Sequence, residues 1–585
     1  MNKRRKKIVK LIPLGATRLK SIYITSLILI FGLLSKLVYL QVFNASNLNN
    51  KALVRQIKRT NALKTRRQIV DRNNRLVAFD KTQYELWGHP KYFRFPGDKS
   101  NQRRTIEEVV IKLSPILNLD KKLLLDKFKD TRDGVRLIDD LNEEQAKNIK
   151  NLNISGIDLL AHSKRFYPQG KIISNIVGFV NDERKGSSGL ELFLEDKIQV
   201  TQKTNIFKKD GKGVPLPDGV GPFDFSNDDK KIKLTLDSRL QKISFNVLTK
   251  QVKKWNAQKG LAIVMNVNNG EILSLASVPS YDPQRFWEYD QKVFKGWYLQ
   301  DLFEPGSTFK PINLAFALEE KVIQKDGFVL DDGQINVGGW PLSNWNKKGN
   351  GYINYPKVLQ VSSNVGMVKI MQNLKPITHW NWLKRIGLDK EIETDLFKST
   401  PGQIKSKEIF INQPIHQAVA SYGQGFSITP LKLVQLHAAL ANGGYEVFPH
   451  VTFEFKRNSI DRKKNKFFSD HVSEVILNWM ETVVEEGSGS NVKINGYRIG
   501  GKTGTAQKAI HGTYSGIACS FVAILPVDNP KYLVFVLIDQ PNKPYAYGST
   551  VAVPVAKEII ESLIVLEKIP PSAAQDALIV NKPLN

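Results

Sequence analysis

The sequence predicts an α+β protein, in which an antiparallel sheet flanked by helices forms a C-terminal domain on an elongated N-terminal region with one membrane helix. Three observations predict this fold class. A long apolar stretch lies near the N-terminus, residues 44–230 are polar with mixed patterns, and strand and helix patterns succeed one another from residue 231 onward. Elements of both types around an antiparallel sheet are typical of α+β domains.

The N-terminus carries the pattern of a membrane anchor. Residues 1–20 hold eight Lys and Arg residues and no acidic residue, and Lys36 is the only charge in residues 21–43. A helix of that length rises about 34 Å, enough to cross a hydrocarbon core of about 30 Å. Lys36 must snorkel to the interface or face a partner helix. The basic flank predicts a cytoplasmic tail, and residues 44–585 are then extracytoplasmic or periplasmic on a single-pass protein of the inner (plasma) membrane.

Two other interpretations of the apolar stretch are weaker. A cleaved signal peptide has a shorter apolar region and an A-x-A-type cleavage site, to which residues 44–46 (NAS) are a poor match. A buried helix of a soluble protein does not explain the basic flank. We therefore expect a basic tail over 1–20 and a transmembrane signal-anchor over 21–43.

Composition limits the classes of function. With 585 residues, 41% of them hydrophobic and 9% aromatic, the chain is not globally disordered. Its one cysteine excludes an intramolecular disulfide framework and a Cys-rich zinc site, and no H-E-x-x-H motif is present. A net charge of +29 indicates nucleic acid, an anionic membrane surface or an acidic polymer as partner, or simply a Lys-rich composition. The predicted topology argues against nucleic acid.

The region 44–230 is expected to form a separate N-terminal domain. Residues 62–80 predict two strands joined by a turn at Asn73-Asn74. Residues 105–158 show helical periodicity, and residues 203–230, rich in Gly, Pro, Asp and Lys, predict a linker or hairpin.

The region 231–570 is expected to form the second domain, followed by a tail over 571–585. Its periodicities predict helices over 238–252, 311–318, 469–487 and 551–566, and strands over 261–267, 271–277, 497–501, 518–525 and 532–538. Asn268-Asn269-Gly270 is a good hairpin signal between the first two strands. The helix at 311–318 is apolar nearly all round, which predicts that it is buried.

Three short motifs in this domain carry chemistry. They are S-x-x-K at Ser307 and Lys310, S-x-N at Ser362 and Asn364, and K-T-G at residues 502–504. Ser307 and Lys310 are neighbours on one helix face. A serine hydroxyl is a poor nucleophile until a base takes its proton, and burial disfavours the charged form of lysine, so a buried Lys310 fits that base. Ser362 would carry a proton to the leaving amine, and Asn364 would donate to the substrate backbone.

The third motif predicts the substrate-binding strand. Lys502 and Thr503 supply a cation and a hydroxyl for a substrate carboxylate, and Gly504 lets the strand approach the substrate closely. Backbone N–H groups of Ser307 and Thr505 would form an oxyanion hole. Each motif alone is common, and S-x-x-K occurs again at residues 490–493 in a loop. The predicted assignment rests on their order and on the element in which each one lies.

With these motifs the chain resembles the class B penicillin-binding proteins, the monofunctional D,D-transpeptidases of peptidoglycan synthesis. The resemblance extends to residues 165–180, 186–191, 260–283, 421–444 and 519–539. It implies a penicillin-binding/β-lactamase-like transpeptidase domain over 231–570 on a pedestal (penicillin-binding protein dimerisation-type) domain over 44–230. The pedestal motif R-G-x-I-x-D-R-N-G lacks both glycines here, where Arg67 and Asn74 stand, although Asn74 still tolerates a positive φ.

The resemblance implies that Ser307 attacks the D-Ala-D-Ala carbonyl of a peptidoglycan stem peptide, and that an amine of a second stem takes the acyl group. β-Lactam antibiotics would acylate the same serine. No cofactor or metal is implied. The implied partners are the membrane, a polytopic glycan polymerase and other division proteins. The compact pedestal and short tail look more like the septal type of enzyme than the elongation type.

The alternative functions are a D,D-carboxypeptidase or β-lactamase, for which Glu408 to Asn412 offers a weak E-x-x-x-N match, and a penicillin-binding sensor or scaffold.

Overall fold

The computed structural model describes residues 15–48, 51, 57–59, 65–99, 102–129, 134–200, 206–209, 215–220, 230–455, 465–510 and 513–572. The chain divides into two compact units, one of residues 1–64 with 201–228, the other of residues 65–200 with 229–585. Most of the predicted basic tail and most of the predicted C-terminal tail lie outside the described residues.

The first unit contains the apolar helix. Helix α1 (Ala16–Val38) continues into a π-helical turn (Tyr39–Phe43), and together they are long and apolar enough to cross a membrane. This helix begins five residues before the predicted span. The Lys36 ammonium lies 5.2 Å from the centroid of the Tyr39 ring. In the same unit β1 (Ile57–Arg59), β8 (Ile206–Lys209) and β9 (Pro215–Val220) form an antiparallel sheet, so the predicted hairpin is confirmed where residues are described.

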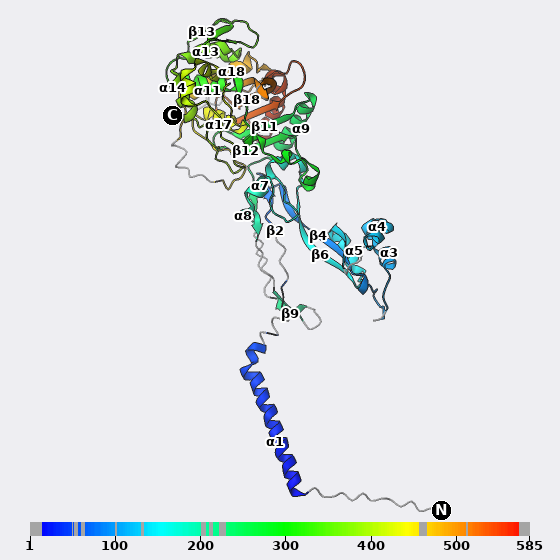
Figure 1. The fold of residues 1–585 in the computed structure, drawn as a ribbon. Helices are drawn as coiled ribbons and strands as arrows, with labels where there is room; N and C mark the ends of the chain where they lie inside the picture. Colours follow the sequence, from blue (N-terminus) through cyan, green and yellow to red (C-terminus); the bar gives the residue numbers. More distant parts are fainter. Residues whose placement is uncertain are drawn as a thin grey trace, which may run out of the picture. The chain divides into compact units, whose positions relative to one another are not determined.

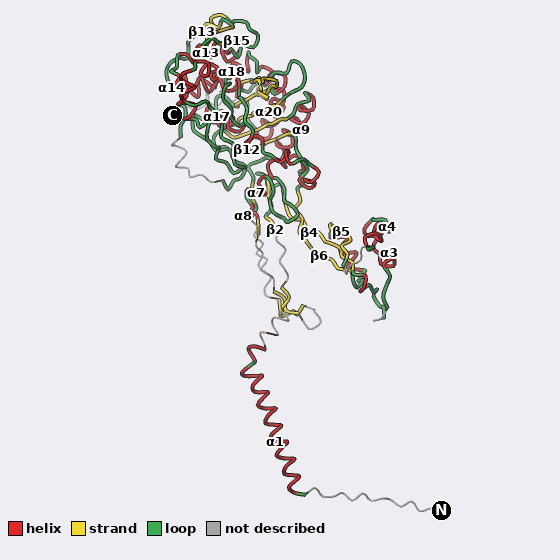
Figure 2. The backbone as a smooth tube through the Cα atoms, viewed as in Figure 1, coloured by secondary structure: helices red, strands yellow, loops and turns green. Residues whose placement is uncertain are grey.

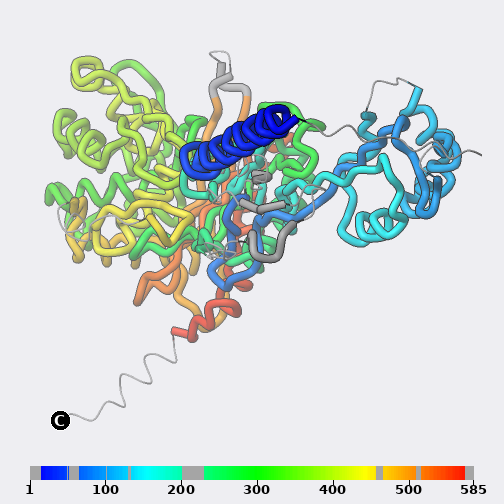
Figure 3. The backbone as a smooth tube through the Cα atoms, turned by 90° about the horizontal axis from the view of Figure 1, so that it is seen from below, coloured from blue at the N-terminus to red at the C-terminus, as the bar shows by residue number. Residues whose placement is uncertain are grey.

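The second unit begins with a sheet on which the pedestal is built. Each strand pairs with the next in the order β10 (Ile232–Lys233), β3 (Ile69–Val70), β4 (Leu76–Gly88) and β5 (Val135–Leu141), and β6 (Ile157–Phe166) also pairs with β4. The β3–β4 turn contains Asn74 at φ 62°, which confirms the predicted turn. Figures 1 and 3 show the paired strands β4 and β6 leading to the helices α3 (Ile106–Leu117), α4 (Lys121–Lys127) and α5 (Glu143–Asn151).

The prediction of helix throughout 105–158 is wrong in part, because strand β5 lies inside that range. Leu137 and Leu141 of β5 are buried in the same cluster as Val109 and Leu113 of α3. A spacing of four residues places two side chains on one face of a helix and also on one face of a strand. The local pattern therefore could not separate the two, and pairing with β4 decides for the strand.

Buried ion pairs join the pedestal motifs. Glu191, fully buried in α7 (Gly189–Phe193), accepts from Arg66 Nε at 2.9 Å and from Arg165 Nε at 2.7 Å. Arg165 also reaches Asp80 at 3.1 Å. Arg66 and Glu191 are 125 positions apart in the sequence, and charges so deeply buried are tolerated only when paired. The network therefore fixes how β2 (Thr65–Arg66) and β4 pack against α7.

The C-terminal domain is built on a second, five-stranded antiparallel sheet. The spatial order of its strands is β12 (Ile272–Val278), β11 (Lys259–Asn266), β19 (Tyr532–Asp539), β18 (Thr513–Leu525) and β17 (Gly500–Ile510). The predicted hairpin at Asn268–Gly270 and the strands over 518–525 and 532–538 are confirmed. Strand β17 begins three residues later than predicted and extends further, and it forms an edge of the sheet.

Helices cover both faces of this sheet (Figures 1 and 2). Helices α9 (Ser238–Lys254) and α20 (Val553–Glu567) pack on one face, where Val264 of β11 is buried. The other face carries α11 (Lys310–Glu319), α17 (Pro430–Ala441) and α18 (Asp470–Glu485), and Ile263 is buried there. Successive strand residues point to opposite faces, so a strand covered on both faces is apolar throughout. All four predicted helices are confirmed.

The remaining described elements of this domain include two small two-stranded sheets and several short helices. The sheets pair β13 (Phe328–Asp331) with β16 (Gly351–Asn354), and β14 (Gln334–Val337) with β15 (Trp340–Ser343). The helices are α10 (Trp297–Gln300), α12 (Tyr355–Gln360), α13 (Asn364–Gln372), α14 (Pro376–Arg385), α15 (Lys407–Asn412), α16 (Pro414–Ser421) and α19 (Gly548–Val551). The end of β15 with the loop that follows it, and the start of α13, line a cleft.

Candidate active site

Ser307 lies in a tight turn at the start of the buried central helix. A 3₁₀ turn (Gly306–Phe309) leads directly into α11. Gly306 has φ 57°, and a Cβ on it would lie 2.9 Å from the Cβ of Ala506, so glycine is required for both conformation and space. Its N–H donates to Gly423 O at 2.9 Å. This turn holds the half-buried Ser307 side chain at the wall of a cleft.

Lys310 lies beneath Ser307 and is fully buried. Its Nζ donates to Ser362 O at 2.7 Å and to Asn364 Oδ1 at 2.8 Å, and it lies 3.3 Å from Ser362 Oγ. Burial, assisted by the positive charge of Lys502, holds the pKa of Lys310 well below its usual value, while the carboxylate of Asp331 acts in the opposite direction. A neutral amine at this position can accept a proton.

The S-x-N motif forms the turn into α13. Ser362 has φ 56°, an uncommon conformation for a residue with a side chain, and Ser363 caps the helix by accepting from Gly366 N at 2.8 Å. Asn364 Nδ2 donates to Ser343 O at 3.1 Å, which orients its Oδ1 toward Lys310. The motif is thus both a helix cap and part of the cleft.

Lys502 approaches the same serine from the edge strand β17. Its Nζ donates to Ser362 Oγ at 2.9 Å and to Thr503 O at 2.9 Å, and burial lowers its pKa to about 7. Ser362 Oγ therefore lies within reach of both lysine side chains. Thr503 Oγ1 lies 2.6 Å from Ser488 Oγ, which extends the hydroxyl-lined wall.

Gly504 and Thr505 lie on β17, where this strand packs beside the Gly306–Phe309 turn that carries Ser307. A Cβ on Gly504 would lie 2.5 Å from Ser520 Oγ and 2.9 Å from Thr308 Cγ2, so the space here suits glycine, and the close approach of this strand to the substrate stays a prediction. Thr505 Oγ1 accepts from Gly548 N at 3.0 Å, which ties the strand to the start of α19.

These side chains surround a cleft of about 590 Å³. Ser307, Ser362, Asn364, Thr503 and Thr505 line it, while Lys310, Lys502 and Gly504 lie behind its wall. The structure thus brings all eight predicted residues together. The arrangement can activate a hydroxyl with a neutral amine, relay a proton through a second hydroxyl and attract an anion with a second amine.

Sequence reasoning missed other residues that line the cleft. They are Asn344, Trp345, Tyr422, Gln424, Ser488, Gln507 and Tyr547, among others. Tyr422 and Gln424 fall inside a stretch already noted for its resemblance, which could have identified them. Ser488 and Asn344 had no comparable signal, since they reach the cleft only through the packing of loops distant in sequence.

Two further features carry no site chemistry. Glu408 is exposed on α15 and is not among the cleft-lining residues, so the weak E-x-x-x-N match does not supply a base.

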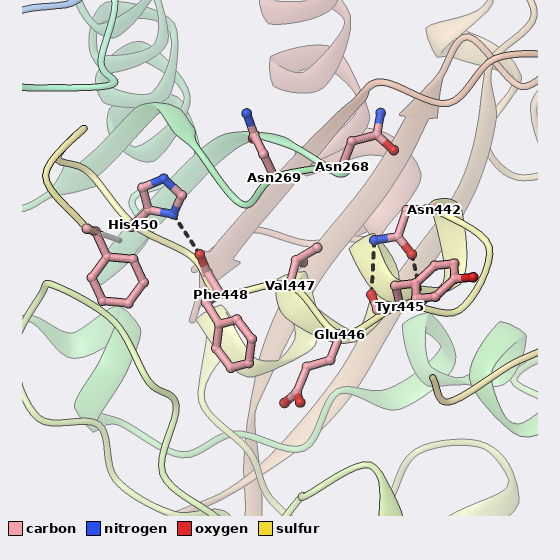
Figure 4. Close-up of a pocket in the computed structure, with 9 residues that line it drawn as sticks. Asn268, Asn269, Asn442, Tyr445, Glu446, Val447, Phe448 and His450 are labelled. Carbon is pink, nitrogen blue, oxygen red and sulfur yellow. Dashed lines mark hydrogen bonds between the residues drawn. The ribbon is translucent and has the colours of Figure 1, made fainter. Parts of the chain in front are cut away.

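A second pocket of about 200 Å³ lies beside the Asn268–Asn269 turn and is shown in Figure 4. Its lining contains none of the motif residues, and His450 Nδ1 there bonds Phe448 O. Among the described residues, no group of three or more His, Cys, Asp or Glu could hold a metal ion.

Comparison with known proteins identifies two family domains in this chain. Residues 260–561 match the penicillin binding protein transpeptidase domain, and residues 62–219 match the penicillin-binding protein dimerisation domain. A peptidoglycan D,D-transpeptidase FtsI homolog of Mesostigma viride is 38% identical over 571 residues, covering 92% of this chain and 94% of that protein. Stage V sporulation protein D of Bacillus subtilis is 33% identical over 513 residues, covering 85% and 77%.

A solved structure supports the fold independently. The crystal structure of a peptidoglycan synthetase from Bifidobacterium adolescentis superposes with a TM-score of 0.63 at 22% identity, covering 88% of this chain and 97% of that one. The fold and the three converging motifs define a serine acyl-enzyme domain on a pedestal. This chain belongs to the penicillin-binding protein transpeptidase family.

Proposed function

We propose that this protein is a serine-type peptidoglycan D,D-transpeptidase that cross-links stem peptides during cell-wall synthesis at the division septum. The observation that carries the proposal is the convergence of two buried lysine side chains, Lys310 and Lys502, on Ser362 beside the cleft-facing Ser307. The names of the relatives from Mesostigma viride and Buchnera aphidicola, both peptidoglycan D,D-transpeptidases, support the substrate class.

The reaction begins with acylation. Ser307 Oγ attacks the carbonyl carbon of the penultimate D-alanine, and neutral Lys310 takes the hydroxyl proton. The tetrahedral oxyanion accepts hydrogen bonds from the N–H groups of Ser307 and Thr505. Collapse of this intermediate breaks the peptide bond, and Ser362 passes a proton to the departing amine of D-alanine. An ester between Ser307 and the stem peptide remains.

Transfer reverses the proton movements. An amine of a second stem attacks the ester carbonyl, loses a proton through Ser362 and Lys310, and releases Ser307 as the new peptide bond forms. Lys502 and Thr503 bind the terminal carboxylate of the donor stem, and Asn364 uses its second amide hydrogen for the donor backbone. A β-lactam follows the same steps as far as the ester with Ser307. No cofactor takes part in this scheme.

Fluorescent-penicillin labelling of the full-length protein tests the nucleophile. Ser307→Ala is expected to abolish covalent labelling, because it removes the cleft-lining hydroxyl to which the proposal assigns the nucleophilic attack. Ser490→Ala is the matched control, since Ser490 starts the second S-x-x-K, whose Lys493 pairs with Glu485. It is expected to label like the wild type. Labelling of Ser307→Ala would refute the assignment, and normal growth on that variant alone would favour a scaffold.

The membrane placement belongs to the same proposal. The helix Ala16–Phe43 anchors the chain once, with the basic N-terminus in the cytoplasm and the catalytic domain outside. A polytopic glycan polymerase would supply strands at this anchor, where Lys36 is a candidate contact. A fluorescent fusion is expected to gather at the division site, and protease added outside the membrane is expected to digest the catalytic domain. Uniform lateral fluorescence or complete protection would contradict these two points.

A further inference from the structure

The loop residue Asn344 completes the hydrogen bonding at the start of α13. A helix leaves its first backbone N–H groups without intrahelical partners. Asn344 Oδ1 accepts from Asn364 N at 2.8 Å and from Val365 N at 3.1 Å, and it lies 3.3 Å from Ser363 Oγ. Since Ser363 Oγ accepts from Gly366 N, these groups are all satisfied at the turn that carries Ser362 and Asn364.

A buried carboxylate holds Asn344 in this orientation. Asn344 Nδ2 donates to Asp331 Oδ1 at 2.8 Å and to Asp331 Oδ2 at 3.0 Å, and Gly333 N donates to the same carboxylate at 2.9 Å. Asp331 is fully buried at the end of β13. Burial alone would raise the pKa of Asp331, but hydrogen bonds, the strongest from Asn350, lower it below its usual value. The carboxylate is therefore charged at neutral pH.

The series of hydrogen bonds that begins at Asp331 ends at Lys310. Asp331 fixes Asn344, Asn344 fixes the first turn of α13, and that turn presents Asn364 Oδ1 and Ser362 O to Lys310 Nζ. Because the amide of Asn344 uses its donor side on Asp331 and its acceptor side on α13, reversing it would set oxygen against carboxylate. The orientation is thus unique.

We propose that Asp331 and Asn344 are positioning residues that hold the Ser362–Asn364 turn in register with Lys310. Neither residue reacts with substrate. The inference rests on the proposed roles of Lys310 and Ser362 and adds the element that places them. A misplacement of about 1 Å at such a turn costs up to about 100-fold in rate.

Two independent effects distinguish this role from a purely structural one. Removing the carboxylate loosens the turn, which slows acylation at saturating β-lactam without changing the affinity of the first complex. Removing its charge also leaves burial and Lys502 unopposed at Lys310, so the pKa of that lysine falls further. The acidic limb of the acylation rate then moves to lower pH, a shift that loss of stability alone does not produce.

The test compares Asp331→Asn with the matched control Asp332→Asn in the full-length protein. Asp332 is the neighbouring carboxylate, but it is exposed and pairs with Lys369. Stopped-flow acylation by a fluorescent penicillin is measured across a pH series, with thermal unfolding as the check of folding. We expect Asp331→Asn to acylate about 10–100-fold more slowly, with its acidic limb at lower pH, and Asp332→Asn to match the wild type.

A folded Asp331→Asn protein with the wild-type rate and pH profile would overturn the inference while leaving the proposed function intact. If Asp331→Asn does not fold, Asn344→Ser replaces it, because a smaller polar side chain breaks the same link without removing the charge. That variant is expected to acylate more slowly with its acidic limb unchanged, and wild-type acylation by it would equally overturn the inference. Labelling of Ser307→Ala, in contrast, would remove the proposed function first.

Discussion

At the scale of single residues, the site depends on keeping two amines at one hydroxyl in different protonation states. Both lysine side chains are buried and both have pKa values below the usual range, because burial disfavours the charged form. Lys310 is the more strongly affected, since the charge of Lys502 adds to its burial, and Lys502 has a pKa of about 7. The environment thus favours the proposed role of Lys310 as the base and leaves Lys502 the better cation.

This electrostatic coupling predicts the direction of a pH shift. The positive charge of Lys502 lowers the pKa of Lys310, so Lys502→Gln is expected to raise that pKa and to move the acidic limb of β-lactam acylation to higher pH. This direction is opposite to the one expected for Asp331→Asn. Lys508→Gln is the matched control, because Lys508 lies on the same strand and pairs with Asp539 away from the cleft. An unmoved limb in a folded Lys502→Gln protein would contradict the coupling.

At the scale of elements, the sequence predicts a helix or a strand correctly where its local periodicity matches the pattern of burial in the structure. The periodicity of residues 469–487 predicts a helix, and the structure has α18 there, with Ser469 as its N-cap accepting from Val472 N. The strand β5 was missed because the four-residue spacing of Leu137 and Leu141 fits two periods. The motif residues were found because their chemistry is local, whereas Asn344 and Ser488 reach the cleft through loops that only tertiary packing places.

The pedestal network makes an element-scale prediction. Glu191→Ala leaves Arg66 and Arg165 buried without their shared carboxylate, which is expected to destabilise the folded protein by about 3–5 kcal/mol. Thermal or denaturant unfolding of the full-length protein measures the loss. Glu183→Ala is the control, since Glu183 forms an exposed pair with Lys185 and its removal is expected to change stability by less than about 1 kcal/mol. Equal effects of the two variants would show that the buried network does not fix the pedestal.

At the scale of the whole molecule, the chain reaches its fold through the size of its core. The one cysteine, Cys519, is buried in β18 as a small apolar residue, and burial raises the pKa of its thiol to about 12. The strands of the central sheet are covered by helices on both faces, and the edge strand β17 meets the nucleophile turn. The proposed catalytic groups are thus carried on helices and strands of the domain core, as a precisely positioned site requires.

The most direct test of the central claim is mass spectrometry of the penicillin-treated protein, followed over time and mapped by peptide digestion. The account predicts one penicilloyl group, attached to Ser307 and persisting far beyond the time of acylation, because the cleft is built to pass its acyl group to an amine. An adduct on another residue would contradict the nucleophile assignment. An adduct on Ser307 that is hydrolysed within seconds would show a β-lactamase in place of a transpeptidase.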